Sequence, residues 1–94
     1  MSEPSLEVPQ YAAIRAMLLS PAWTEAEKWV VKWQYNRSLQ LLGGFQTALA
    51  EAILRADEGN LARLRLGFPD QVDGYLAWSR GDLAGRLRDA GVMD

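Results

Sequence analysis

Residues 45–56 have the sequence FQTALAEAILRA, and this stretch decides the fold class. Its apolar side chains follow the spacing i, i+3, i+4, i+7, i+8 and i+11, which places them on one face of an α-helix. They are Phe45, Ala48, Leu49, Ala52, Ile53 and Ala56. Glu51 and Arg55 lie four residues apart on another side, where we expect an exposed ion pair that contributes about 0.3 kcal/mol. The stretch therefore predicts an amphipathic helix with a continuous inward-facing stripe.

A turn and a shorter helix follow on the C-terminal side. Residues 57–60, Asp-Glu-Gly-Asn, are typical of a turn in which either Asp57 or Asn60 caps the next helix. The inward-facing residues of that helix are Leu61, Leu64 and Phe68. Arg63 and Arg65 lie off this stripe.

Two more helices are predicted toward the C-terminus. Pro69 suits the first position of a helix, where its missing amide hydrogen is not needed. Gly81 ends this helix, and Asp82 is expected to cap the last one, which Gly91 terminates. Asp82 can also pair with Arg86 across one helical turn. The inward-facing residues are Val72, Tyr75 and Leu76 in the first of these helices and Leu83, Ala84 and Leu87 in the second.

Two helices are predicted on the N-terminal side. The first covers residues 9–19, with a stripe formed by Tyr11, Ile14 and Leu18. Thr24 and Glu27 then have the spacing of a capping box, in which each side chain accepts a hydrogen bond from the other residue's amide. The stripe of the second helix is Ala26, Trp29, Val30 and Trp33. This helix either breaks at residues 36–38 or continues until the glycines at 43–44 end it.

The composition favours the same fold class. Alanine and leucine supply 27 residues, whereas valine, isoleucine and threonine supply nine, a bias toward helices over sheets. A chain of 94 residues is expected to hold one core. We predict an all-α fold, a compact bundle of five to six short helices, with residues 9–94 as a single domain and residues 1–8 as a flexible lead.

The absence of histidine and cysteine excludes most catalytic and metal chemistry. It removes disulfides, thiolate nucleophiles, Cys/His zinc sites and imidazole bases. The carboxylate pairs that could act instead lie at predicted helix starts or turns, where capping explains them: Glu25/Glu27, Asp57/Glu58 and Asp70/Asp73. We therefore expect no catalytic residue, no cofactor and no metal site.

The charge balance disfavours a dedicated nucleic-acid binder. Ten Lys/Arg against twelve Asp/Glu give a net charge of −2, whereas such binders need a basic face that neutralises phosphates. Arg55, Arg63 and Arg65 remain a candidate basic patch. These arginines form either a binding surface or an ordinary solvated face. The second interpretation follows from Asp57 and Glu58, which lie close in the sequence and weaken the positive field.

Neither a membrane span nor an export signal is visible. The longest apolar run, at residues 39–42, is interrupted by Gln40 and falls far short of the roughly 18 to 20 residues that span a bilayer. Residues 1–10 lack the basic start and apolar centre of a secretory signal. We expect a cytoplasmic protein that does not bind membranes.

Tryptophan is abundant, and two of the four tryptophans share one helix face. Trp29 and Trp33 lie one turn apart, so they either form the central core layer of a small bundle or contact a partner. Val30 and Val31 make this helix apolar on more than one side, and such a helix needs cover on both. A partner protein or a second copy in a homodimer would supply that cover.

Residues 42–78 resemble small uncharacterised proteins encoded in phages and prophages. The most recognisable pieces are ADEGNLARL at 56–64 and GFPDQVDGY at 67–75. The resemblance implies a shared fold. By analogy, it also suggests that the chain acts by binding the surface of a host protein, as small acidic phage proteins such as anti-CRISPR and other anti-defence inhibitors do.

The leading hypothesis is a non-catalytic protein-interaction module of phage or prophage origin that binds a host or phage macromolecule. Its candidate contact residues are Trp29, Trp33, Arg55, Arg63 and Arg65. One alternative is a virion or assembly component that self-associates. A weaker alternative is a nucleic-acid-binding regulator that uses the three arginines.

Overall fold

The computed structural model describes residues 10–93, and this range contains helices and turns but no strand. The helices are α1 (Tyr11–Leu19), α2 (Glu25–Gln34), α3 (Asn36–Leu39), α4 (Gly44–Arg55), α5 (Glu58–Gly67), α6 (Pro69–Ser79) and α7 (Ala84–Asp89). The predicted all-α fold is confirmed. The described range holds seven helices, more than the five or six expected, because α2 and α3 are separate. The lead predicted over 1–8 and the helix start predicted at residue 9 lie outside it.

Among the described residues, α2 and α6 make the most extensive contact between two helices. Val30 and Val31 on α2 are 0% exposed, and Val72 on α6 is 1% exposed. Gly74 of α6 faces α2: a Cβ atom there would be 2.6 Å from the carbonyl oxygen of Ala26 and 3.0 Å from Cγ2 of Val30. Because only glycine fits this approach, the two helices lie closer than a larger side chain would allow. We call this the α2–α6 contact.

The buried apolar side chains form one cluster around this contact. It consists of Ile14, Met17, Trp29, Val30, Val31, Leu49, Ala50, Ile53, Val72, Leu83, Leu87 and Val92. The C-terminal turn is tied to the cluster by the Tyr35 hydroxyl, which donates to the Val92 carbonyl at 2.6 Å. Every long helix except α5 contributes a fully buried side chain.

Three helix starts follow the sequence prediction. The capping box of α2 is complete: the Glu27 amide donates to Thr24 Oγ1 at 3.1 Å, and the Thr24 amide donates to Glu27 Oε1 at 2.8 Å. Of the two candidates for α5, Asp57 is the cap, because its Oδ1 accepts from the Asn60 amide at 2.8 Å. Pro69 begins α6.

The predicted cap of the last helix is wrong. Gly81 has a φ of +81°, and its amide donates to the Trp78 carbonyl at 3.0 Å. The Asp82 amide donates to the Ala77 carbonyl at 3.0 Å. This pair of bonds is a Schellman motif, so Asp82 belongs to the end of α6. The N-cap position of α7 falls to Leu83, which is buried and offers no side-chain cap.

The predicted pair between Arg86 and Asp82 is also wrong. Arg86 Nη1 instead contacts Glu27 Oε2, the carboxylate that completes the capping box of α2. The guanidinium of Arg86 lies 4.3 Å from the ring centroid of Trp23, close enough for a cation–π interaction. Arg86 therefore joins α7 to the first turn of α2.

The glycines at 43–44 begin a helix and do not end one. α2 ends at Gln34, and the side chain of Asn36 stabilises the turn between α3 and α4. Asn36 Oδ1 accepts from the Leu42 amide at 2.8 Å, and its Nδ2 donates to Thr47 Oγ1 at 3.1 Å. Gly43 is the N-cap residue of α4. Of the two alternatives from the sequence, a helix that continues to the glycines is wrong. The interruption is at Tyr35, just before the predicted residues 36–38, which form part of the short helix α3.

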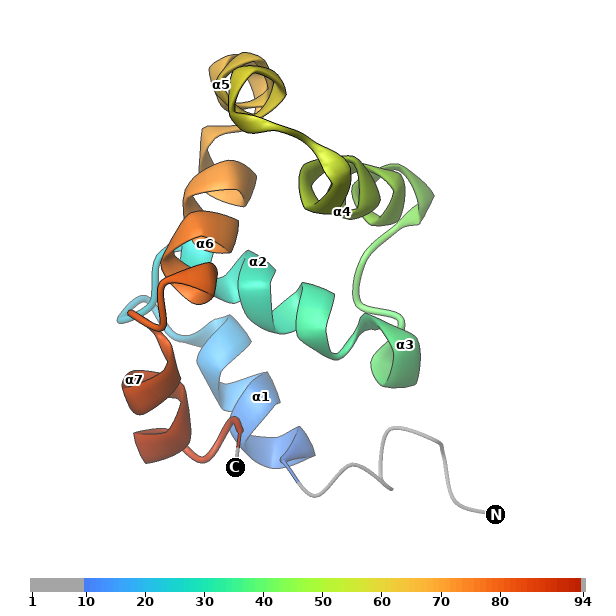
Figure 1. Cartoon of the computed structure of the whole chain (residues 1–94). Coiled ribbons are helices and arrows are strands. Elements are labelled where there is room, and N and C mark those ends of the chain that lie inside the picture. Colours follow the sequence, from blue (N-terminus) through green and yellow to red (C-terminus); the bar gives the residue numbers. More distant parts are fainter. Residues whose placement is uncertain (1–9, 94) are drawn as a thin grey trace.

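α4 and α5 lie together at one end of the described chain, with α1 and α7 toward the opposite end (Figure 1). α6 leads from α5 back to α2. The residues predicted to face inward from α5, which are Leu61, Leu64 and Phe68, are only half-buried. The side chains at this end of the molecule are therefore less buried than those at the α2–α6 contact.

Candidate interaction surface

Trp29 and Trp33 contact neighbours within the chain. Trp29 is 6% exposed and belongs to the buried cluster, whereas Trp33 is half-buried and packs against it. Their rings stack with centroids 5.9 Å apart, and the Trp33 ring meets Tyr75 of α6 edge-on at 6.0 Å. The face of α2 that carries them is thus covered in part by α6.

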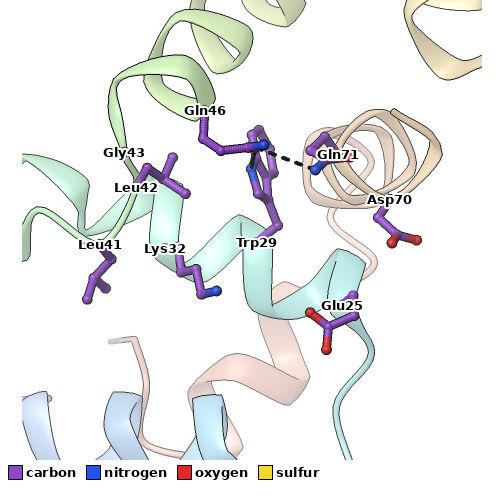
Figure 2. A pocket seen from close by; sticks show the side chains of 9 residues that line it. All are labelled: Glu25, Trp29, Lys32, Leu41, Leu42, Gly43, Gln46, Asp70 and Gln71. Carbon is purple, nitrogen blue, oxygen red and sulfur yellow. Dashed lines mark hydrogen bonds between the residues drawn. The ribbon is translucent and has the colours of Figure 1, made fainter. Parts of the chain in front are cut away.

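A pocket of 320 Å³ opens beside Trp29, where α2, α4 and α6 meet (Figure 2). Trp29 Nε1 donates to Gln46 Oε1 at 3.0 Å, and Gln71 Nε2 donates to the same oxygen at 3.4 Å. The amide of Gln46 therefore links α2, α4 and α6. Lys32 lines the pocket from α2, on the other side of the Trp29 ring from Gln71 (Figure 2).

The pocket is also lined by charged side chains. Its two carboxylates, Glu25 and Asp70, belong to exposed residues at the first turns of α2 and α6. Glu25 Oε1 also lies 4.0 Å from Nζ of Lys28. Lys32 adds an amine to this lining, which contains no hydroxyl and no thiol. The hydrogen bonds that join three helices account for the side chains of Trp29, Gln46 and Gln71.

Residues 10–93 contain no group of three or more acidic side chains placed to hold a metal ion. No helix within that range is long and apolar enough to cross a membrane.

Arg65 is held by an ion pair and lies apart from the other two candidate arginines. Its Nε and Nη2 donate to the two carboxylate oxygens of Asp73 on α6, at 2.6 and 3.1 Å. The hydrogen bond from Arg65 lowers the pKa of Asp73 below its ordinary value, with a smaller opposing effect of burial. The same bond raises the pKa of Arg65. Arg65 thus fastens α5 to α6.

Arg55 and Arg63 line one hollow of 410 Å³ between α4 and α5. We call it the α4–α5 hollow, and its lining consists of Ala52, Arg55, Ala56, Asn60, Arg63 and Leu64. Arg55 forms the predicted pair with Glu51, but at 3.9 Å and with both side chains largely exposed. Arg63 Nη1 donates to the neutral side chain of Asn60 at 3.1 Å. No carboxylate lines the hollow.

The apolar stripe predicted for α4 is only half covered. Leu49 and Ile53 are buried, together with Ala50, which lies off the predicted stripe. Phe45 is 64% exposed, and Ala48 and Ala52 are exposed as well. The prediction that all six residues face inward is therefore wrong. The helix is turned so that the side toward Ala50 meets the core, and the opposite edge of the stripe stays outside.

This uncovered edge, formed by Phe45, Ala48 and Ala52, is the outer strip of α4. Its Ala52 end belongs to the α4–α5 hollow. At its other end, the Phe45 ring lies 5.6 Å from the ring of Phe68, at the junction of α5 and α6. The strip and the hollow together form a mixed apolar and basic surface across this end of the molecule.

Two exposed leucines on α4 and α5 were not singled out from the sequence. Leu66 of α5 is 88% exposed and Leu54 of α4 is 50% exposed. Both lie off the periodic stripes of their helices, which is the signal that could have identified them. Neither lines the α4–α5 hollow, and isolated exposed leucines are common, so the proposed surface does not depend on them.

Comparisons of this chain with protein-family models, with curated proteins and with solved structures found no match. The functional argument therefore rests on the surface itself.

Proposed function

We propose that this chain is a small non-catalytic protein-interaction module that binds a partner through the outer strip of α4 and the α4–α5 hollow. The observation that carries the proposal is the uncovered half of the α4 stripe, with Phe45 64% exposed beside two exposed alanines. Burying apolar surface is the main favourable term in protein association, and aromatic residues are enriched where proteins contact each other.

The proposed setting is the cytoplasm of a bacterium that carries a phage or prophage. The resemblance to phage-encoded proteins covers residues 42–78, which include α4, α5 and α6 and therefore the whole proposed surface. A module of this kind would act by occupying the surface of a host or phage macromolecule. Inhibition of a host defence protein is the version that the resemblance favours.

Self-association is the alternative for the same surface, since the outer strip could bury against a second copy in a virion or assembly component. The structure gives less support to nucleic-acid binding. Arg65 is paired with Asp73, so two of the three candidate arginines remain for phosphates. A net charge of −2 would also oppose association with a polyanion.

Site-specific photocrosslinking tests the proposal. A benzophenone amino acid replaces Phe45 in one variant and Leu19 in a control, because Leu19 is 75% exposed but lies on α1. Irradiation in cells that naturally contain the chain should give a discrete protein adduct from position 45 and none from position 19. An adduct with the mass of two copies would favour self-association. Equal adducts from both positions, or none from either, would contradict the proposal.

A further inference from the structure

The α4–α5 hollow has the size and lining of an anchor site for one large apolar side chain. Its volume is 410 Å³, and Ala52, Ala56 and Leu64 supply an apolar wall. α4 and α5 are joined by a short turn at residues 56–57, and α5 buries no side chain completely. Among residues 10–93, no side chain fills this space between α4 and α5.

The charge around this wall is positive and is weakly compensated. Arg55 has its nearest carboxylate, Glu51, at 3.9 Å, with exposed fractions of 83% and 67% for the two side chains. A pair this exposed contributes little and leaves the guanidinium available. Arg63 donates to an uncharged amide. By contrast, Arg65 and Arg86 are each in a close ion pair with a carboxylate from another helix.

We infer that the α4–α5 hollow receives an acidic amphipathic helix of the partner protein. One large apolar side chain of that helix enters the hollow, and carboxylates three or four residues away on the same face pair with Arg55 and Arg63. Guanidinium groups suit this task because they bind carboxylates with two parallel hydrogen bonds. The inference rests on the proposed function and adds the chemistry of the partner.

Other anionic partners fit the lining less well. Binding of single-stranded nucleic acid normally uses aromatic rings on which bases stack, and the hollow contains none. An anionic membrane surface would require a cluster of several cations, whereas the hollow has two. A helix with a few carboxylates matches both the number of arginines and the apolar wall between them.

Fluorescence anisotropy with designed probes tests the inference on the full chain. The acidic probe is a helical peptide of about 18 residues with one central leucine and glutamates three and four residues from it. The neutral probe carries glutamine in place of each glutamate. The acidic probe should bind about fivefold more tightly, the effect expected of two exposed guanidinium–carboxylate pairs. This preference should shrink as the salt concentration rises.

Two matched double variants locate the effect. Arg55→Gln with Arg63→Gln should abolish the preference for the acidic probe. Arg37→Gln with Arg88→Gln removes the same charge from exposed positions on α3 and α7 and should leave the preference intact. Circular dichroism verifies that both variants are folded. Failure of both probes to bind, equal binding of the two, or a preference that survives Arg55→Gln with Arg63→Gln would overturn the inference. So would tighter binding of an oligonucleotide or of phosphatidylserine vesicles.

A filling variant provides an independent check. Ala52→Leu places a larger side chain in the hollow from an exposed helical position and should weaken binding of both probes at least fivefold. Unchanged binding would overturn the inference. The crosslink from position 45 separates this outcome from the proposed function. If a partner adduct persists while the probes show no preference, the partner chemistry is wrong and the interaction module stands.

Discussion

The α2–α6 contact and the α4–α5 pair are both helix–helix neighbours, but they differ in how closely they pack. In the α2–α6 contact, Gly74 lets α6 approach the backbone of Ala26, and Val30 is completely buried. Between α4 and α5 a hollow of 410 Å³ remains, and no α5 side chain is fully buried. Gly74 thus allows α2 and α6 to pack closely. Between α4 and α5, small side chains such as Ala52 and Ala56 leave a space.

This difference suggests a division of labour within a short chain. The α2–α6 contact supplies stability, because its apolar side chains are removed from water. α5 and the outward side of α4 contribute less to stability and present apolar and basic groups to a partner. Substitutions in the two regions should therefore have opposite effects: large on unfolding and small on binding in the first region, and the reverse in the second.

The largest effect is expected at Gly74. In Gly74→Ala, the new Cβ would lie 2.6 Å from the Ala26 carbonyl oxygen, so α6 must shift away from α2. We expect a loss of about 2 kcal/mol, after allowing for the better helix propensity of alanine. Urea denaturation measures it. Gly85→Ala on α7 is the matched control, because a Cβ there meets nothing within 4 Å, and it should stabilise the chain slightly.

The next comparison removes apolar groups from each region. Val30→Ala at the α2–α6 contact deletes two methyl groups from a side chain that is 0% exposed and should destabilise the chain by about 1.5 kcal/mol. Leu66→Ala deletes more atoms from a side chain that is 88% exposed and should change stability by no more than about 0.5 kcal/mol. Equal losses in urea denaturation would remove the distinction between the two regions.

Helix caps provide a smaller test of the same distinction. Thr24→Ala breaks the capping box of α2 and should destabilise the whole chain by about 1 kcal/mol, because α2 belongs to the core. Asp57→Ala removes the cap of α5, where we expect local opening to dominate. Hydrogen exchange should then accelerate in α5 amides with little change in α2. Uniform acceleration along the chain would contradict the prediction.

The smallest effect concerns the ion pair that fastens α5 to α6. Arg65 lowers the pKa of Asp73 below its ordinary value of 3.8, so the carboxylate stabilises the folded chain when it is ionised. This contribution is complete above the ordinary pKa and is lost as the pH falls through the lower, folded-state value. Both side chains are largely solvated, which keeps the effect small.

Comparison with Asp73→Asn isolates this contribution. The urea midpoint of the natural chain should exceed that of the variant at about pH 6, and the gap should narrow as the pH falls below about 4. A gap that stays constant, or widens toward low pH, would mean that the pair does not stabilise the fold.

The sequence predicts local features of this fold well. The capping box at Thr24, the cap at Asp57 and the proline at the start of α6 depend on residues a few positions apart, and all three are present. Asp82 misled the prediction because its role is set by the positive φ of Gly81. Arg86 misled it because its actual partner, Glu27, is distant in the sequence.

The candidate surface was only partly predictable for the same reason. Periodicity identifies the apolar stripe of α4, but which half is covered depends on where α2 and α6 lie. Arg55 and Arg63 were identified by residue type, whereas their shared hollow requires the relative position of α4 and α5. The pairing of Arg65 with Asp73 joins two different helices, so the spacing of residues within one helix could not predict it.

Amide chemical-shift mapping by NMR, with the acidic helical probe added to the full chain, tests the central claim most directly. We predict that the largest shifts fall on the outer strip of α4 and on the α4–α5 hollow, while Val30 and Gly74 at the α2–α6 contact hardly change. The indole signal of Trp29, whose N–H is bonded to Gln46, should also stay in place. Largest shifts around Trp29 or along α1, with α4 and α5 unaffected, would contradict the account.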